Sequence, residues 1–158
     1  MTTKRIWARK ILIASALIWI GMLLGVSFLA TPVKFLAPSL TLPVALDVGR
    51  QTFGIFSIVE FLASLTVLAV AVLSGGRRRN VVLAVLVGGL VAAQFAWLLP
   101  VLDARVEIIL QGGTPDDSNL HNLYIVIDSA KLFMLSAICW YAQAVSPKRE
   151  RDVAANAR

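Results

Sequence analysis

Residues 51–102 read QTFGIFSIVEFLASLTVLAVAVLSGGRRRNVVLAVLVGGLVAAQFAWLLPVL, two apolar runs joined by a short basic loop. As a helix, each run is long enough to cross the roughly 30 Å hydrocarbon core of a bilayer. The chain contains four such apolar segments, at about 6–30, 51–73, 81–102 and 120–144. This pattern predicts an all-α, integral membrane four-helix bundle, with residues 1–158 forming a single membrane domain.

The composition supports a bilayer as the natural solvent of the chain. Hydrophobic residues make up 58% of the 158 residues, whereas a soluble domain has about 45–50%. The net charge of +6 could suggest nucleic acid as a partner. However, the basic residues form short clusters beside the apolar runs, which is typical of membrane orientation. We therefore expect the lipid bilayer as a partner, and no nucleic acid.

The segments between the runs predict how the helices are connected. Residues 31–50 contain prolines and mixed polarity, which indicates an interfacial turn with a short helix. Residues 103–119 are predicted as an extracytoplasmic loop. Pro100 is expected to kink the third helix or to end its membrane part, and the first residues of the loop could continue as a helical extension outside the hydrocarbon. Residues 145–158 are predicted as a cytoplasmic tail.

The distribution of charge predicts the orientation. One side carries most of the basic residues, against only Glu150 and Asp152: Lys4, Arg5, Arg9, Lys10, Arg77, Arg78, Arg79, Lys148, Arg149, Arg151 and Arg158. The other side has more acidic than basic residues: Asp47, Asp103, Glu107, Asp116 and Asp117 against Lys34, Arg50 and Arg105. By the positive-inside rule, both termini and the Arg-rich loop are cytoplasmic. We expect a bacterial inner (plasma) membrane.

Three ionisable residues fall inside the predicted spans: Glu60, Asp128 and Lys131. Glu60 and Asp128 each lie about nine residues, or roughly 13 Å, from the outer end of their helix. Gln94 lies at a similar depth in the third span. Because charge is costly at mid-bilayer, we expect these groups to pair with one another or to meet water.

The expected pairs are Glu60 with Lys131, and Asp128 with His121, Arg50 or Arg105. Intramembrane charges of this kind indicate a polar cluster that opens to the extracytoplasmic side. The predicted ligand-binding or proton-handling residues are Glu60, Asp128, Lys131, His121, Arg50, Asp103, Arg105 and Gln94. Paired charges that only fix the register of the helices are the structural alternative.

The leading functional hypothesis is a small ligand- or ion-binding, or transport-related, membrane protein. The alternatives are an accessory subunit of a larger membrane complex and a metal- or quinone-dependent oxidoreductase. His121 is the only histidine, so a metal would have to use the weak mixed set His121, Glu60 and Asp128. No nucleophile elbow, P-loop or dinucleotide motif is present. We therefore assign no catalytic residue and no cofactor, and an enzyme is the less favoured reading.

Small residues in the spans bear on packing. Cys139 is the only cysteine, which excludes an intrachain disulfide and favours a packing role. Gly21-x-x-x-Gly25 indicates close helix approach, within the chain rather than in a dimer, although a homo-oligomer is left open.

Short patterns along the chain resemble those of a known family. Residues 19–35, WIGMLLGVSFLATPVKF, are followed by GRQTFGIF at 49–56. Further on come Leu99-Pro100, Asp103-Ala-Arg105 and Leu120-His121. Together they are similar to the transmembrane-protein-205-like family of small four-helix membrane proteins. The resemblance implies a four-helix membrane bundle, and that family, a domain of unknown function, carries no established activity.

Overall fold

The computed structural model describes residues 3–74 and 78–144, and all regular structure in these ranges is helical. Arg77 of the basic loop and the predicted tail, residues 145–158, lie outside them. The helices are α1 Thr3–Leu23, α2 Thr31–Lys34, α3 Leu42–Leu73, α4 Arg78–Ala93, α5 Leu99–Leu110 and α6 Leu120–Gln143, with π-helical segments η1 Leu24–Ala30 and η2 Gln94–Leu98.

These elements form four long rods, because each π-helical segment joins two α-helices. The rods are Thr3–Lys34, Leu42–Leu73, Arg78–Leu110 and Leu120–Gln143, and all four are long and apolar enough to cross a membrane. The prediction of an all-α chain with four candidate spans is confirmed.

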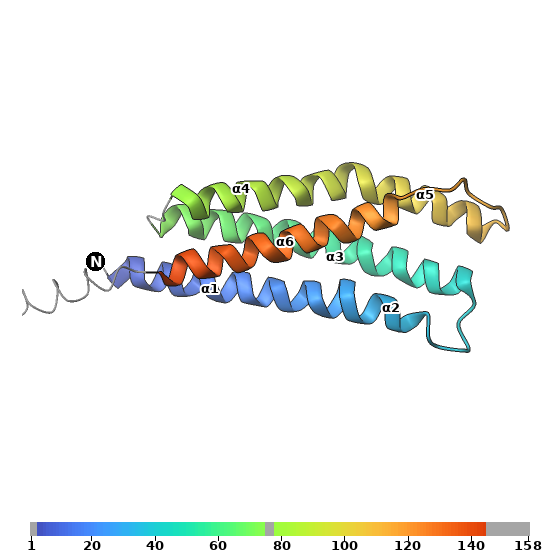
Figure 1. Cartoon of the computed structure of the whole chain (residues 1–158), viewed down its shortest axis with the longest axis horizontal. Helices are drawn as coiled ribbons and strands as arrows, with labels where there is room; N and C mark the ends of the chain where they lie inside the picture. Colours follow the sequence, from blue (N-terminus) through green and yellow to red (C-terminus); the bar gives the residue numbers. More distant parts are fainter. Residues whose placement is uncertain (1–2, 75–77, 145–158) are drawn as a thin grey trace, which may run out of the picture.

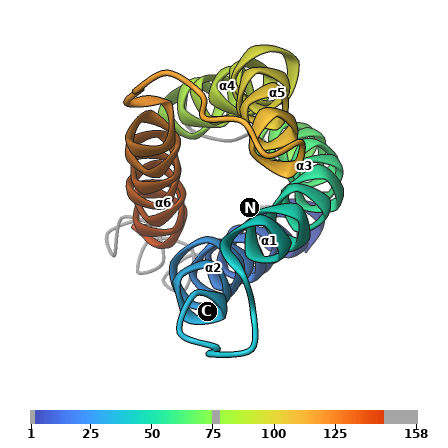
Figure 2. The ribbon, with the colours of Figure 1, turned by 90° about the vertical axis from the view of Figure 1, so that its right-hand side faces the viewer.

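The rods run alternately up and down, and their ends gather at two places (Figure 1). At one end, called the terminal end, lie the start of α1, the connection from α3 to α4, and the end of α6. At the other, the loop end, lie the α2–α3 and α5–α6 connections. Viewed along the bundle, the first rod packs against α3 and α6, and α4 packs against the same two helices from the opposite side (Figure 2).

The helices extend further than the apolar runs do. Residues 31–50, predicted as an interfacial turn with a short helix, are mostly helical, because α3 already begins at Leu42. Pro43 lies in the first turn of α3, where its missing N–H has no helical partner to lose. At the other connection, α5 continues to Leu110, which confirms the predicted helical extension beyond Pro100.

Pro32 and Pro100 both stand just after a π-helical segment. A proline within a helix removes one backbone hydrogen bond, and its ring clashes with the carbonyl four residues earlier. A wider π-helical turn before the ring relieves that clash. The rod therefore continues as a helix through each proline, as the predicted extension beyond Pro100 requires.

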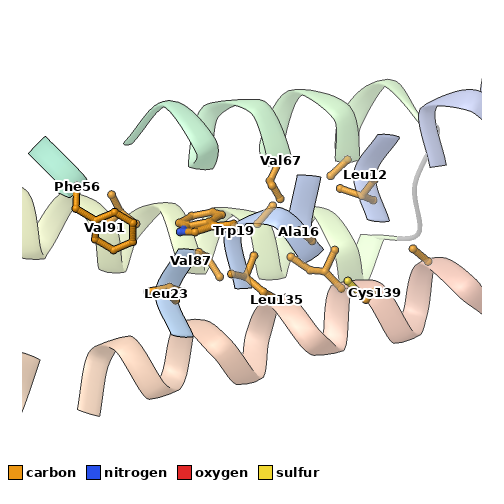
Figure 3. Packing of buried hydrophobic residues seen from close by; sticks show 14 residues of the cluster. Leu12, Ala16, Trp19, Leu23, Phe56, Val67, Val87, Val91, Leu135 and Cys139 are labelled. Carbon is orange, nitrogen blue, oxygen red and sulfur yellow. The ribbon is translucent and has the colours of Figure 1, made fainter. Parts of the chain in front are cut away.

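Most of the apolar core lies in the terminal half of the bundle, and it extends past the level of Trp19 and Glu60 to Leu23 and Phe56 (Figure 3). Its fully buried members come from all four rods and include Leu12, Ala16, Trp19, Val67, Ala71, Ala84, Val87, Leu135 and Ile138. Cys139 lies in this core as a free thiol, in agreement with its predicted packing role. A methyl group added at Gly21 or Gly25 would meet nothing within 4 Å, so the predicted close approach through these glycines is wrong within the described chain.

Candidate functional site

A buried polar cluster crosses the middle of the bundle, and every rod contributes to it. We define the polar cluster as Trp19 of α1, Glu60 of α3, Gln94 of η2, and Asp128 and Lys131 of α6. None of these residues is more than 3% exposed. Each residue lies near the middle of its rod, so the cluster is buried halfway along the length of the bundle.

Lys131 is the centre of the cluster. Its Nζ lies 2.5 Å from Oε1 of Glu60 and 2.8 Å from Oδ1 of Asp128. The predicted pair of Glu60 with Lys131 is therefore confirmed. The side chain of Lys131 is completely buried, so removal of either carboxylate would leave an ammonium group short of a partner.

Two neutral donors complete the shell around the carboxylates. The indole Nε1 of Trp19 donates to Oε1 of Glu60 at 3.1 Å. The amide Nε2 of Gln94 donates to Oδ1 of Asp128 at 3.0 Å. Oε1 of Glu60 therefore accepts two hydrogen bonds, and Oδ1 of Asp128 accepts one and forms an ion pair with Lys131, which stabilises charge in a place without bulk water.

The other side of the cluster is not satisfied. Among the described residues, Oδ2 of Asp128 and Oε1 of Gln94 are buried and have no hydrogen-bond partner. Two carboxylates and one ammonium also give a formal charge of −1. A buried acceptor without a donor costs about 1–3 kcal/mol, so the cluster is suited to receive one more hydrogen-bond donor or positive charge.

Two adjoining cavities lie between the cluster and the loop end. The inner cavity has a volume of about 290 Å³, and its lining includes Asp128, Ser27 and Phe28. The outer cavity has a volume of about 310 Å³, and its lining includes Lys34 and Asp103. Both cavities are lined by Thr31, Phe35, Phe53, His121 and Tyr124. The polar cluster therefore borders the inner cavity through Asp128, and the inner cavity adjoins the outer one at their shared lining residues.

The two arginines at the loop end, Arg50 and Arg105, bind partners at that end. Arg50 lies 2.7 Å from Glu107 and 3.2 Å from Asp47. Arg105 donates to the backbone carbonyl of Asp116. The structure thus places Arg50, Asp103 and Arg105 around the outer cavity, away from the polar cluster.

The expected pairing of Asp128 with His121, Arg50 or Arg105 is wrong. Asp128 binds Lys131, which lies three residues further along the same helix and so on the same face. His121 is exposed and lines both cavities.

The weak metal set is not assembled in the parts of the chain that the structure describes. No group of three or more His, Cys, Asp or Glu side chains within residues 3–74 and 78–144 could hold a metal ion. The ammonium of Lys131 lies where a cation between Glu60 and Asp128 would have to sit.

Several residues of the site were not predicted. Trp19, Ser27 and Phe53 appeared only as letters of the quoted stretches, and Tyr124 only as part of the fourth apolar segment. The signal for Trp19 was available, since a tryptophan in the middle of a span needs a partner for its N–H. Ser27 lies in η1, and its buried Oγ has no partner among the residues described; nothing in the sequence indicates a π-helical turn there.

The chain matches no protein-family model, no curated protein and no solved structure. The resemblance to the transmembrane-protein-205-like family stays a prediction from short patterns. Function therefore has to be inferred from the geometry of the polar cluster and its cavities.

Proposed function

We propose that the chain is an integral membrane protein that binds a small ligand in the cavities of its loop-end half. The observation that carries this proposal is the position of Asp128. Its carboxylate belongs to the buried cluster through Lys131 and Gln94, and the same residue lines the inner cavity. A ligand in the cavity would therefore act directly on the charges that join the four rods.

The loop end is the extracytoplasmic side in this proposal. The terminal end carries the exposed basic residues Lys4, Arg5, Lys10, Arg78 and Arg79, whereas acidic residues outnumber basic ones at the loop end. The positive-inside rule places the terminal end in the cytoplasm. The proposed location is the inner membrane of a bacterium, with the ligand site in the outer half of the bilayer.

A ligand site explains the unpaired atoms better than a purely structural role does. A cluster that only fixed helix register would gain stability from closing every hydrogen bond. Here Asp128 keeps an unpaired oxygen beside a cavity. The cavities have apolar walls with a few polar groups, and each is close to the lower end of the roughly 300–1,000 Å³ typical of small-molecule sites.

Native mass spectrometry tests the proposal directly. The full chain in nanodiscs of phosphatidylethanolamine and phosphatidylglycerol would be incubated with three eight-carbon probes: octylammonium, octanol and octanoate. We expect at least one probe to give a one-to-one adduct.

A cavity-filling variant supplies the matched comparison. Ser27→Phe places a ring in the inner cavity and should lower the adduct about tenfold, equivalent to about 1.4 kcal/mol. Leu29→Phe adds a ring in the same π-helical segment, where Leu29 is 63% exposed and lines neither cavity, and should leave the adduct unchanged. Absence of any adduct to the unaltered chain, or equal loss in both variants, would contradict the proposal.

A further inference from the structure

We propose that the ligand is an amphipathic organic cation, whose ammonium group binds Asp128 in the inner cavity while its apolar part extends toward lipid. This inference rests on the proposed function, since it names the class of ligand for the same cavity. It follows from the charge of the cluster, the unpaired polar atoms, the aromatic walls and the position of the opening.

The charge of the cluster sets the sign of the ligand. Glu60 and Asp128 share a single ammonium, that of Lys131. The formal charge of −1 lies in a place where the low dielectric makes uncompensated charge expensive. A ligand that carries +1 neutralises the cluster, whereas an anion would double its charge.

The unpaired atoms set the hydrogen bonding of the ligand. Oδ1 of Asp128 already forms an ion pair with Lys131 and accepts a hydrogen bond from Gln94, and Oδ2 accepts from none of the described residues. The hydroxyl of Ser27, in the lining of the same cavity, is also buried without a partner. An ammonium group brings several N–H donors, so it can bond to the carboxylate and to the hydroxyl oxygen at the same time.

Aromatic side chains form much of the remaining wall. Phe28, Phe35, Phe53 and Tyr124 all line the inner cavity. The rings of Phe53 and Tyr124 meet edge to face, with centroids 5.0 Å apart. A carboxylate among aromatic rings suits an alkylammonium ion, because the negative faces of the rings attract cations and repel anions.

The residues on the lipid side of the inner cavity indicate that the ligand has an apolar part. Phe28 and Pro32 of the first rod and Ile125 of α6 line the cavity and are exposed side chains of two neighbouring rods. In a bilayer this surface faces acyl chains, since it lies on rods that are apolar enough to span. An amphipathic cation can therefore enter from the lipid between these two rods and leave its chain at the opening.

The three eight-carbon probes separate charge from shape, because they share a chain and differ in the head group. In native mass spectrometry of the unaltered chain in nanodiscs, octylammonium should give at least about tenfold more adduct than octanol, by analogy with other desolvated charge pairs. Octanoate should give least. Equal adducts from octylammonium and octanol, or a preference for octanoate, would overturn the inference and leave the cavity itself established.

Two variants locate the ammonium group. Asp128→Asn keeps the shape of the side chain and should lower octylammonium binding about tenfold, and more strongly than it lowers octanol binding. Phe53→Leu lies outside the polar cluster and should lower octylammonium binding about threefold, because one aromatic face is lost. If Asp128→Asn does not fold, Phe53→Leu and Ser27→Ala carry the same test.

The failure of this inference is distinguishable from that of the proposed function. If octylammonium binding is unchanged in Asp128→Asn, or in both Phe53→Leu and Ser27→Ala, the proposed cation site is wrong but the proposed ligand cavity is not contradicted. A chain that binds none of the three probes would remove both.

Discussion

The two halves of the bundle, on either side of the polar cluster, are built on different principles. In the terminal half, small and branched side chains such as Ala16, Ala71 and Leu135 are buried together and fill the space between the rods. In the loop half, a smaller buried group of Leu98, Leu99 and Tyr124 lies beside two cavities. The difference indicates that side chains fill the terminal half closely, whereas the loop half keeps open space between the rods.

Local helix geometry follows the same division. Both π-helical segments lie on the loop side of the bundle or at its boundary with the polar cluster. Ser27 of η1 and Gln94 of η2 each have a buried polar atom without a partner in the described chain. π-helical turns are frequent at functional sites because they shift side chains out of the regular helical positions. Here they coincide with the unpaired atoms.

The largest expected effect comes from breaking the boundary between the two halves. Lys131→Met leaves two buried carboxylates without their ammonium partner. Loss of one partner of a buried ion pair costs about 3–5 kcal/mol. We therefore expect a large decrease in the free energy of unfolding, measured by denaturant titration in mixed micelles, together with loss of the defined packing of both halves.

A neutral replacement of the whole triad is the matched control. The triple variant Glu60→Gln, Asp128→Asn, Lys131→Met carries no buried charge and should recover most of the lost stability, since well-packed neutral groups can replace buried ion pairs. It should not recover octylammonium binding. A single Lys131→Met variant as stable as the unaltered chain would show that the cluster does not join the two halves.

A smaller effect is expected when one hydrogen bond between the halves is removed. Trp19→Phe keeps most of the buried ring and deletes the donor to Glu60. Hydrogen bonds to charged groups contribute about 1.5–3 kcal/mol, and we expect a loss of that size in the same titration. Trp97→Phe, at a position 54% exposed, should change stability little. If Trp19→Phe lowers the free energy of unfolding no more than Trp97→Phe does, the indole contributes through apolar packing and its hydrogen bond to Glu60 does not stabilise the bundle.

The parts of the structure that the sequence predicted are those that depend on one helix at a time. Apolar length alone predicted four spans, and depth from the helix ends placed Glu60 and Asp128 at one level, where Lys131 contacts both carboxylates. The acidic and basic pattern also gave the same grouping of termini and basic loop that Figure 1 shows for the described chain. Each of these inferences uses only residue spacing and the rise of a helix.

The missed parts depend on how the helices are rotated against each other. The partner of Asp128 was predicted wrongly because the position of an arginine along its helix does not show which face of the helix it occupies. Arg50 binds the carboxylate of Glu107, and Arg105 binds the backbone carbonyl of Asp116, both at the loop end. The two π-helical segments change that rotation part of the way along a rod. Periodicity assumes a constant 3.6 residues per turn, so it could not place Ser27 on the cavity.

The smallest expected effect comes from enlarging a side chain in each half, by one carbon at Gly49 and by two at Ala16. Gly49 is buried on α3, and a side chain there would meet the end of the Lys34 side chain, which is flexible and lies beside the outer cavity. Gly49→Ala should therefore displace the ammonium of Lys34 and gain about 0.5–1 kcal/mol from the better helix former. In the tight half, Ala16 is fully buried, and Ala16→Val should cost about 1–3 kcal/mol through overpacking. A higher free energy of unfolding for Gly49→Ala and a lower one for Ala16→Val, measured by the same denaturant titration, would confirm that the loop half has room that the terminal half lacks. Equal losses of stability in both variants would show that the two halves are packed alike.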